Sequence, residues 1–317
     1  MAKIARPTKP LADVNVLPQP DGSNKVVACF MPDPDILVPE GQSRAVLALD
    51  ASLSIKKMFG EPPTVFNPTP SPNYVQMVAR KLGAILCGVA RSGKVSMIYW
   101  AVGANGGETE QIGEFDEQEV ASADISGPSP KPGTGKRNWG RGTQILPPIK
   151  HIVENVARGS DWTMGVIITD GIIEDEDAAM DYCKQLGKNL LASGKQDQFK
   201  LVLIGVGEEI DEGQLERFDD MFEGTELEDK VDLWSHGVAA SMREESDIID
   251  VLFGELMTEE IEVAPSGSVL DSQGREIASW ADGLPGKITF TLPKGCTSFT
   301  VHTPAADVTQ DISQASD

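Results

Sequence analysis

The chain has 317 residues, so we expect one large domain and a smaller one. Its 49 Asp and Glu residues against 27 Lys and Arg residues give a net charge of −22, which argues against binding to nucleic acid or to an anionic membrane surface. Four scattered cysteines and an N-terminus without an apolar signal segment predict a cytoplasmic protein with free thiols.

The two ends of the chain are rich in β-strand signals. Residues 1–12 are expected to be disordered, and residues 13–42 contain short apolar runs around a proline- and aspartate-rich turn. Residues 261–304 alternate polar and apolar positions, which is typical of antiparallel sheet, and residues 305–317 are expected to be a disordered tail. We predict that the two flanks, 13–42 and 261–304, pair into one small β-sandwich; two independent flaps are the alternative.

Between the flanks, residues 43–260 repeat a pattern of buried strand followed by amphipathic helix. Residues 44–49 are all Ala, Val or Leu except Arg44, and such an apolar run predicts a strand buried on both faces of a parallel sheet. Asn73 is a candidate N-cap for the next helix, and residues 94–102 form the next strand, which implies a right-handed parallel crossover. Further strands are predicted at 163–169, 199–207 and 231–235, and the last predicted helix has Ile249, Leu252, Phe253, Leu256 and Met257 on its apolar face.

Three loops of this region carry oxygen ligands. The residues are Asp50, Ser52 and Ser54 after the first strand, Thr143 at the start of a helix, and Asp170 after a later strand. In open α/β sheets, ligands bind at the carboxyl edge where such strands end. Carboxylates and hydroxyls are hard ligands, which suit Mg²⁺ or Mn²⁺ rather than zinc or copper. Taken singly, the serines are equally explained as turn residues and Thr143 as a helix cap.

The motifs D-A-S-L-S at 50–54, G-T-Q at 142–144 and T-D-G at 169–171 resemble the metal-ion-dependent adhesion site (MIDAS) of the von Willebrand factor type A (vWA) family. The resemblance covers residues 43–260, and the expected type is an intracellular prokaryotic one. It implies an α/β fold with a doubly wound, mostly parallel six-stranded sheet and one antiparallel edge strand. The flanks would add their small β-sandwich to this domain.

The resemblance also implies roles for the site residues. Ser52, Ser54 and Thr143 would bind the metal directly, whereas Asp50 and Asp170 would act partly through water or hydrogen bonds. The implied cofactor is Mg²⁺, with Mn²⁺ or Ca²⁺ as alternatives. The implied partner is a protein whose Asp or Glu carboxylate completes the coordination of the metal.

The expected function is a metal-dependent protein–protein interaction module, an adaptor in an intracellular multiprotein assembly of a stress, defence or ATPase-associated kind. No Walker A motif is present, so an ATPase would be a separate chain. A magnesium-dependent hydrolase or phosphoryl-transfer enzyme is the alternative, although His151, His236 and His302 stand apart from the metal loops in the sequence. A structural subunit with an incidental metal is a third alternative.

A glycine- and proline-rich loop ahead of the helix predicted to start at Thr143 carries basic residues in an otherwise acidic chain. These residues are Lys131, Lys136, Arg137 and Arg141, with Trp139 among them. We predict that the last three basic residues attract an acidic partner segment and that the tryptophan anchors it. The alternative is a solvated insert with no part in recognition.

Overall fold

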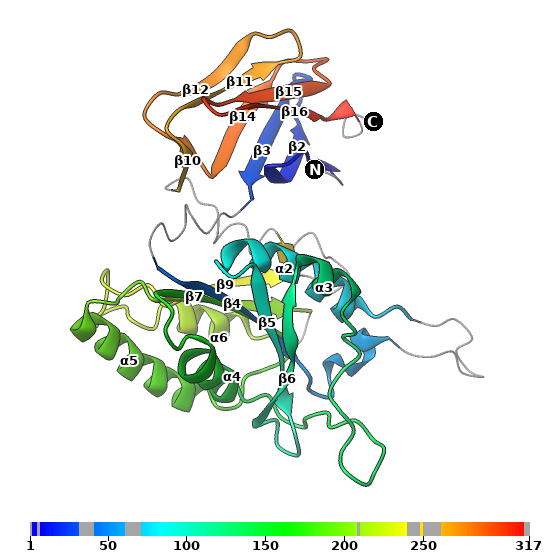
Figure 1. The fold of residues 1–317 in the computed structure, drawn as a ribbon, viewed down its shortest axis with the longest axis vertical. Coiled ribbons are helices and arrows are strands. Elements are labelled where there is room, and N and C mark those ends of the chain that lie inside the picture. Colours follow the sequence, from blue (N-terminus) through cyan, green and yellow to red (C-terminus); the bar gives the residue numbers. More distant parts are fainter. Residues whose placement is uncertain are drawn as a thin grey trace. The chain divides into compact units, whose positions relative to one another are not determined.

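The structure is a computed structural model that describes residues 2–4, 7–31, 41–60, 71–207, 210–239, 248–249 and 261–313 (Figure 1). Contacts divide the chain into two compact units. Unit 1 comprises Met1–Leu37 and Phe253–Asp317, and unit 2 comprises Val38–Leu252. Most of the last predicted helix lies outside the described residues.

Unit 1 is built from antiparallel strands. One sheet has the order β1-β2-β3-β14 and another the order β12-β11-β15-β16, while β10 pairs with β13. The bounds are β1 Ala2–Lys3, β2 Leu11–Pro18, β3 Asn24–Phe30, β10 Glu262–Ala264, β11 Gly267–Asp271, β12 Glu276–Trp280, β13 Leu284–Pro285, β14 Lys287–Leu292, β15 Ser298–His302 and β16 Asp307–Asp311.

The two ends of the chain meet within unit 1. Strand β3 from the N-terminal segment pairs with β14 from the C-terminal segment, with Val26 opposite Phe290. Apolar side chains from both four-stranded sheets share one core, in which the rings of Phe290 and Phe299 lie 5.0 Å apart. The same core therefore stabilises strands that are far apart in the sequence.

Three strands of unit 1 lie wholly or partly in segments that the sequence predicts to be disordered. Strand β1 and the start of β2 at Leu11 lie inside the segment 1–12, and β16 lies inside the segment 305–317. Strand β16 pairs with β15 along its length, but only Gln310 of its five residues is buried. A polar edge strand of this kind has no apolar alternation, so its sequence pattern does not reveal it.

Unit 2 contains a six-stranded sheet with the order β6-β5-β4-β7-β8-β9. The bounds are β4 Ser43–Asp50, β5 Lys94–Val102, β6 Glu108–Asp116, β7 Trp162–Thr169, β8 Phe199–Val206 and β9 Trp234–Ala239. Neighbouring strands are parallel except for β6, which is antiparallel to β5 at one edge. Strand β4 is central and almost fully buried, as its apolar run predicts.

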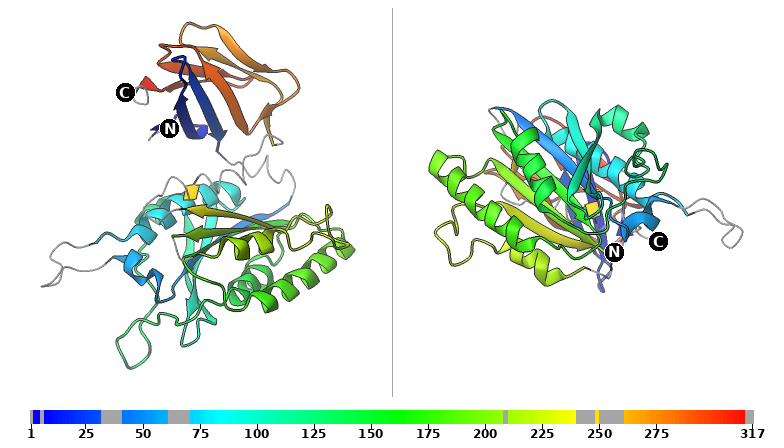
Figure 2. Two further views of the ribbon diagram at one scale, coloured as in Figure 1. Left: turned by 180° about the vertical axis from the view of Figure 1, so that it is seen from behind. Right: turned by 90° about the horizontal axis from the view of Figure 1, so that it is seen from below.

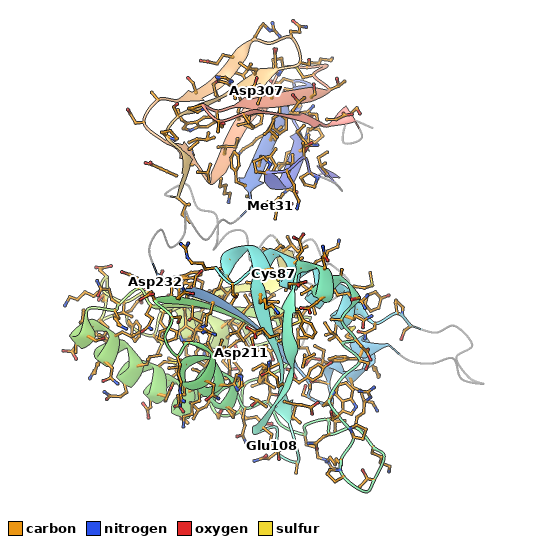
Figure 3. The ribbon with its side chains drawn as sticks, viewed as in Figure 1. Met31, Cys87, Glu108, Asp211, Asp232 and Asp307 are labelled. Carbon is orange, nitrogen blue, oxygen red and sulfur yellow. The ribbon has the colours of Figure 1, made fainter. Side chains whose placement is uncertain are left out.

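Helices lie on both sides of this sheet (Figures 1 and 2). The bounds are α2 Tyr74–Val89, α3 Glu117–Ser122, α4 Leu146–His151, α5 Glu176–Ser193 and α6 Glu212–Asp219, with a 3₁₀ turn η1 at Ile55–Phe59 and a π-helical turn η2 at Ile152–Val156. Helix α2 packs so closely on β5 that a side chain at Gly83 would meet Met97. Its Cys87 thiol donates to the Phe115 carbonyl of β6 at 3.4 Å (Figure 3). Helices α4, α5 and α6 share a core with the other face of the sheet.

The predicted fold class, α/β with a doubly wound sheet, is wrong for the chain as a whole. Among the described residues, three of the four sheets are antiparallel throughout, and strands contain more residues than helices do. Within those residues β-structure predominates over helix, and parallel pairing is confined to one sheet of unit 2. The class was inferred from the long central segment, whereas most antiparallel strands are short and come from the flanks.

Two further observations concern the helices and the cysteines. None of the helices in the described ranges combines the length and the apolar character that crossing a membrane requires. All four cysteines are buried, and none forms a disulfide in the described part of the chain.

Candidate functional site

The two candidate carboxylates lie at the ends of adjacent strands. Asp50 is the last residue of β4, and Asp170 directly follows β7. Because β4 and β7 are neighbouring parallel strands, both ends reach the same edge of the sheet. The structure therefore brings together the loops that carry Asp50 and Asp170, 120 residues apart in number.

Hydroxyl groups link the two loops. The Ser52 and Ser54 side-chain oxygens lie 2.8 Å apart, and the Ser54 hydroxyl donates to Asp170 Oδ1 at 2.8 Å. Since the Ser54 proton is used on Asp170, the Ser52 hydroxyl is the donor between the two serines. The serines and the aspartate thus form one continuous hydrogen-bonded chain.

Thr143 faces the same place from the third loop. A Cβ built on Gly171 would lie 3.7 Å from Thr143 Oγ1 and 3.9 Å from Ser54 Oγ, so both hydroxyls lie beside this glycine. Thr143 is buried, and its hydroxyl makes no hydrogen bond within the described part of the chain. Five oxygen-bearing side chains from three loops therefore gather within a small volume, which we call the oxygen cluster: Asp50, Ser52, Ser54, Thr143 and Asp170.

Asp50 is the most deeply buried member of the oxygen cluster, with 1% of its surface exposed. Burial raises the pKa of its carboxyl group, against the hydrogen bonds that it accepts from the Ser52 amide at 2.7 Å and the Thr169 hydroxyl at 3.0 Å. A divalent cation beside this group would favour its ionised form and offset the effect of burial.

The loop that leads to Thr143 is fixed to the loop after β4. The Gly140 amide donates to the Ala51 carbonyl at 3.0 Å, and the Leu53 amide donates to the Gly140 carbonyl at 2.9 Å. Gly140 has no room for a side chain, because a Cβ there would lie 1.9 Å from the Ala101 carbonyl oxygen. Because Gly140 has no side chain, the loop that leads to Thr143 can lie close to the backbone on either side of Ser52.

The loop after β7 is fixed to the start of α4. The Asp175 carboxylate accepts hydrogen bonds from the amides of Ile145 at 2.7 Å and Leu146 at 3.0 Å. The Glu174 amide donates to the Thr143 carbonyl at 2.9 Å. Asp175 therefore binds the first amides of α4 and stabilises the start of that helix.

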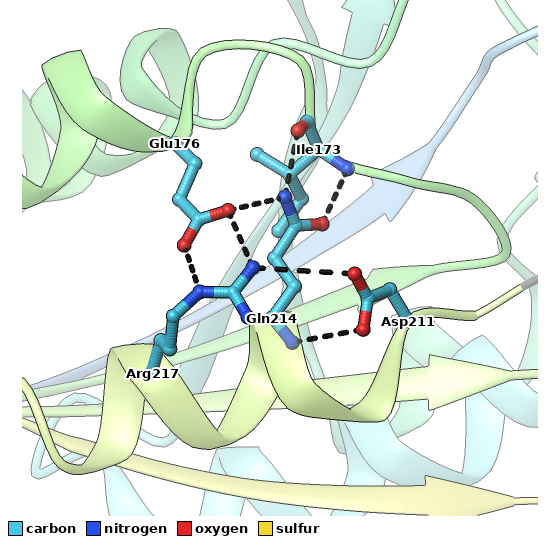
Figure 4. Close-up of polar contacts among 5 residues, drawn as sticks. All are labelled: Ile173, Glu176, Asp211, Gln214 and Arg217. Atoms are coloured by element: carbon cyan, nitrogen blue, oxygen red, sulfur yellow. Dashed lines mark hydrogen bonds and ion pairs between the residues drawn. The ribbon is translucent and has the colours of Figure 1, made fainter.

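A buried glutamine of α6 holds the same loop from the other side (Figure 4). The Gln214 side chain accepts from the Ile173 amide at 2.7 Å and donates to the Ile173 carbonyl at 2.8 Å. It also donates to Glu176, whose carboxylate accepts from Arg217 at 2.6 and 2.9 Å. Because Gln214 is 41 residues from Ile173 and follows no motif, the sequence contains no signal for this contact.

The pair of Glu176 and Arg217 gives a prediction about pH. Arg217 first, and Gln214 after it, hold the pKa of Glu176 below its ordinary value. The pair therefore stabilises the fold at pH values above the pKa that Glu176 has in the unfolded chain. This contribution is lost as the pH falls through the lower pKa that Glu176 has in the folded state. We expect Arg217→Gln to lower the free energy of unfolding by roughly 0.5–1 kcal/mol at neutral pH, since half-exposed Arg217 is screened by solvent.

Urea unfolding at about pH 7 and about pH 3 measures this difference. We expect the difference between Arg217→Gln and the unchanged protein to shrink at the lower pH. Arg158→Gln is the matched control, since Arg158 is exposed and makes no ion pair within the described residues. An equal difference at both pH values would contradict the role of the pair.

Two of the residues predicted to contact a partner make contacts within unit 2. The Arg137 guanidinium donates to the carbonyls of Gly127 at 2.7 Å and Pro128 at 3.2 Å, which fixes the loop to itself. The ring of Trp139 packs against that of Phe59, with centroids 4.9 Å apart. Lys136 and Arg141 remain exposed.

The three histidines do not belong to the oxygen cluster. His151 lies on α4, His236 contacts Asp219 at 2.8 Å, and His302 contacts Asp307 in unit 1. Across the described ranges, no group of three or more His, Cys, Asp or Glu side chains is placed to hold a metal ion. A cation at the cluster would therefore depend on hydroxyl oxygens as well as carboxylates.

Comparison with known proteins gives matches among solved structures only. No family profile matches the chain, and no curated protein matches it. The PilB minor pilin from Streptococcus sanguinis has a TM-score of 0.40 at 11% identity and covers 78% of each chain. The pilus adhesin RrgA from Streptococcus pneumoniae has a TM-score of 0.39 at 8% identity, over 97% of this chain and 65% of that one. The adhesive tip pilin GBS104 from group B Streptococcus agalactiae has a TM-score of 0.41 at 8% identity, over 97% and 92%.

These findings contradict three expectations from the sequence. The predicted membership of the vWA family is wrong, since no family profile matches and the matched structures are described as pilins and adhesins. The MIDAS assignment depended on that family and is wrong with it. The predicted role as an adaptor in an intracellular assembly was inferred from that family and is wrong with it.

Proposed function

We propose that the chain is a non-enzymatic ligand-binding protein whose binding site is the oxygen cluster, and that a divalent cation, Mg²⁺ or Mn²⁺, binds there. The main evidence for the proposal is that three loops meet at the hydrogen-bonded serines and Asp170. The proposal itself depends on the geometry of the loops.

The donors fit a hard cation. Hydroxyl and carboxylate oxygens are the ligands of Mg²⁺ and Mn²⁺, which keep part of their water shell. Thr143 has a hydroxyl without a hydrogen bond in the described residues, and Asp50 is a buried carboxylate whose pKa is raised by burial. Both features suit a neighbouring positive charge, since burial of a carboxylate otherwise disfavours its ionised form.

Calorimetric titration of the full chain with Mg²⁺ and with Mn²⁺ tests the proposal. We expect the unchanged protein to bind a single cation and Asp50→Ala to bind none, because the variant lacks the charge at the base of the oxygen cluster. Asp177→Ala is the matched control, since Asp177 is an exposed carboxylate on α5 outside the cluster. Equal heats for the unchanged protein and Asp50→Ala would contradict the proposal.

A further inference from the structure

Basic residues gather on two segments that the fold places side by side. Residues 51–60 and 125–153 together contain seven Lys and Arg residues and no Asp or Glu, in a chain with a net charge of −22. The segments are joined by the Gly140 hydrogen bonds and by the packing of Phe59 on Trp139. Basic residues are therefore concentrated in the two segments that also contain Ser52, Ser54 and Thr143 of the oxygen cluster.

Five of these basic residues are exposed and lie within three positions of Phe59, Trp139 or Gly140 in the sequence. Arg137 is one of them, but its guanidinium binds carbonyls of its own loop. We call the other four the basic surface: Lys56, Lys57, Lys136 and Arg141. None of the four forms an ion pair within the described ranges, so their charges are available for a ligand.

Few acidic groups adjoin the basic surface. Asp170 accepts from Ser54, and the Glu110 carboxylate accepts from the Ser129 amide at 2.8 and 3.1 Å. Glu174 lies beside Gly142, where a Cβ would approach its carboxylate to 2.5 Å. These carboxylates keep their negative charge, because their hydrogen-bond donors are neutral groups. Asp124 lines the same pocket as Gly135 and Arg137, which makes four adjoining carboxylates against the seven basic residues of the two segments.

We infer that the basic surface binds an acidic segment of a protein ligand. The inference rests on the proposed function, because it names the class of ligand for the proposed binding site. Oppositely charged surfaces raise the rate of association, which matters here because the rest of this acidic chain repels an anionic ligand. Leu53 and Ile172, exposed to 49% and 59%, lie on the cluster loops and offer apolar contacts to the same segment.

A protein segment fits the surface better than a nucleic acid does. Single-stranded nucleic acids bind by stacking bases on exposed aromatic rings. Here the ring of Phe59 is buried, Trp139 packs on it, and Tyr99 is 3% exposed. The aromatic rings of these segments are therefore packed inward rather than arranged as a stacking platform.

Fluorescence anisotropy of a labelled short polyglutamate peptide, added to the full chain at low salt, tests the inference. We expect the combined variant Lys56→Gln, Lys57→Gln, Lys136→Gln and Arg141→Gln to bind about tenfold more weakly than the unchanged protein. The matched control is Arg158→Gln, Lys188→Gln, Lys195→Gln and Lys230→Gln, which removes the same charges from exposed positions of unit 2. We expect this control to bind like the unchanged protein or more weakly by a small factor.

The titration is repeated with a chelator, with Mg²⁺ and with single-stranded DNA of matched charge. Peptide binding that survives the chelator but is lost in the basic-surface variant supports the inference even if the cation proposal fails. Equal weakening in the two combined variants would overturn it, since the net charge alone would then explain binding. Tighter binding to the DNA than to the peptide would overturn the assignment of a protein ligand.

Discussion

Gly140→Ala should destabilise unit 2 by about 1–3 kcal/mol, the usual effect of forcing extra volume into a packed site. The added methyl group would lie 1.9 Å from the Ala101 carbonyl oxygen and 3.1 Å from the Gly106 Cα, and both are backbone atoms that cannot rotate away. The loop at Gly140 would have to move from Ala51 and Leu53, which would separate Thr143 from the serines. Urea unfolding measures the destabilisation, and calorimetry with Mn²⁺ should show loss of binding.

Gly133→Ala is the control in the same loop. Gly133 has nothing within 4 Å of a built Cβ, but its φ of +73° makes any side chain strained. We expect a loss of about 1 kcal/mol from that strain, with cation binding unchanged. Retained Mn²⁺ binding in Gly140→Ala would contradict the role of the close approach in shaping the oxygen cluster.

Gln214→Leu should lower the free energy of unfolding by about 2–4 kcal/mol. The leucine fills a similar volume but leaves the amide and carbonyl groups of buried Ile173 without hydrogen bonds, at about 1–3 kcal/mol for each group. The loop that carries Asp170 and Asp175 would also lose the hydrogen bonds of Gln214 and keep the contact of Glu176 with Arg217 on α6. We therefore expect weaker Mn²⁺ binding in addition to the lower stability.

Gln185→Leu is the matched control for this change. Gln185 is an exposed residue of α5 whose side chain contacts only Asn189 within the described residues. We expect its effect on unfolding to stay within about 0.5 kcal/mol. A similar loss of stability in both variants would show that Gln214 contributes no more than a surface glutamine.

The elements around the oxygen cluster were predictable because their causes are local. The apolar run that ends at Asp50 forms a buried central strand, and Asn73 accepts the hydrogen bond of a helix cap from Gln76 at 2.9 Å. The residue types at the strand ends also suggested that Asp50 and Asp170 lie near each other. Burial, capping and strand direction are short-range properties that a single sequence expresses.

The contacts that hold the cluster were not predictable from the same sequence. Gln214, Asp175 and Gly140 act on loops that are brought near them only by the completed fold. Arg137 was assigned to a partner, but its guanidinium binds the carbonyls of its own loop. The sequence alone indicated where basic residues are concentrated. Whether each of them binds its own loop or stays available to a partner depends on the backbone geometry of the fold.

Titration of the full chain with Mn²⁺, followed by the electron paramagnetic resonance signal of the free ion, tests the proposed cation site most directly. We expect the unchanged protein to remove a single equivalent of Mn²⁺ from solution. The combined variant Ser52→Ala, Ser54→Ala and Thr143→Ala should leave that signal at its protein-free intensity. If the variant removes as much Mn²⁺ as the unchanged protein, the oxygen cluster is not a cation site.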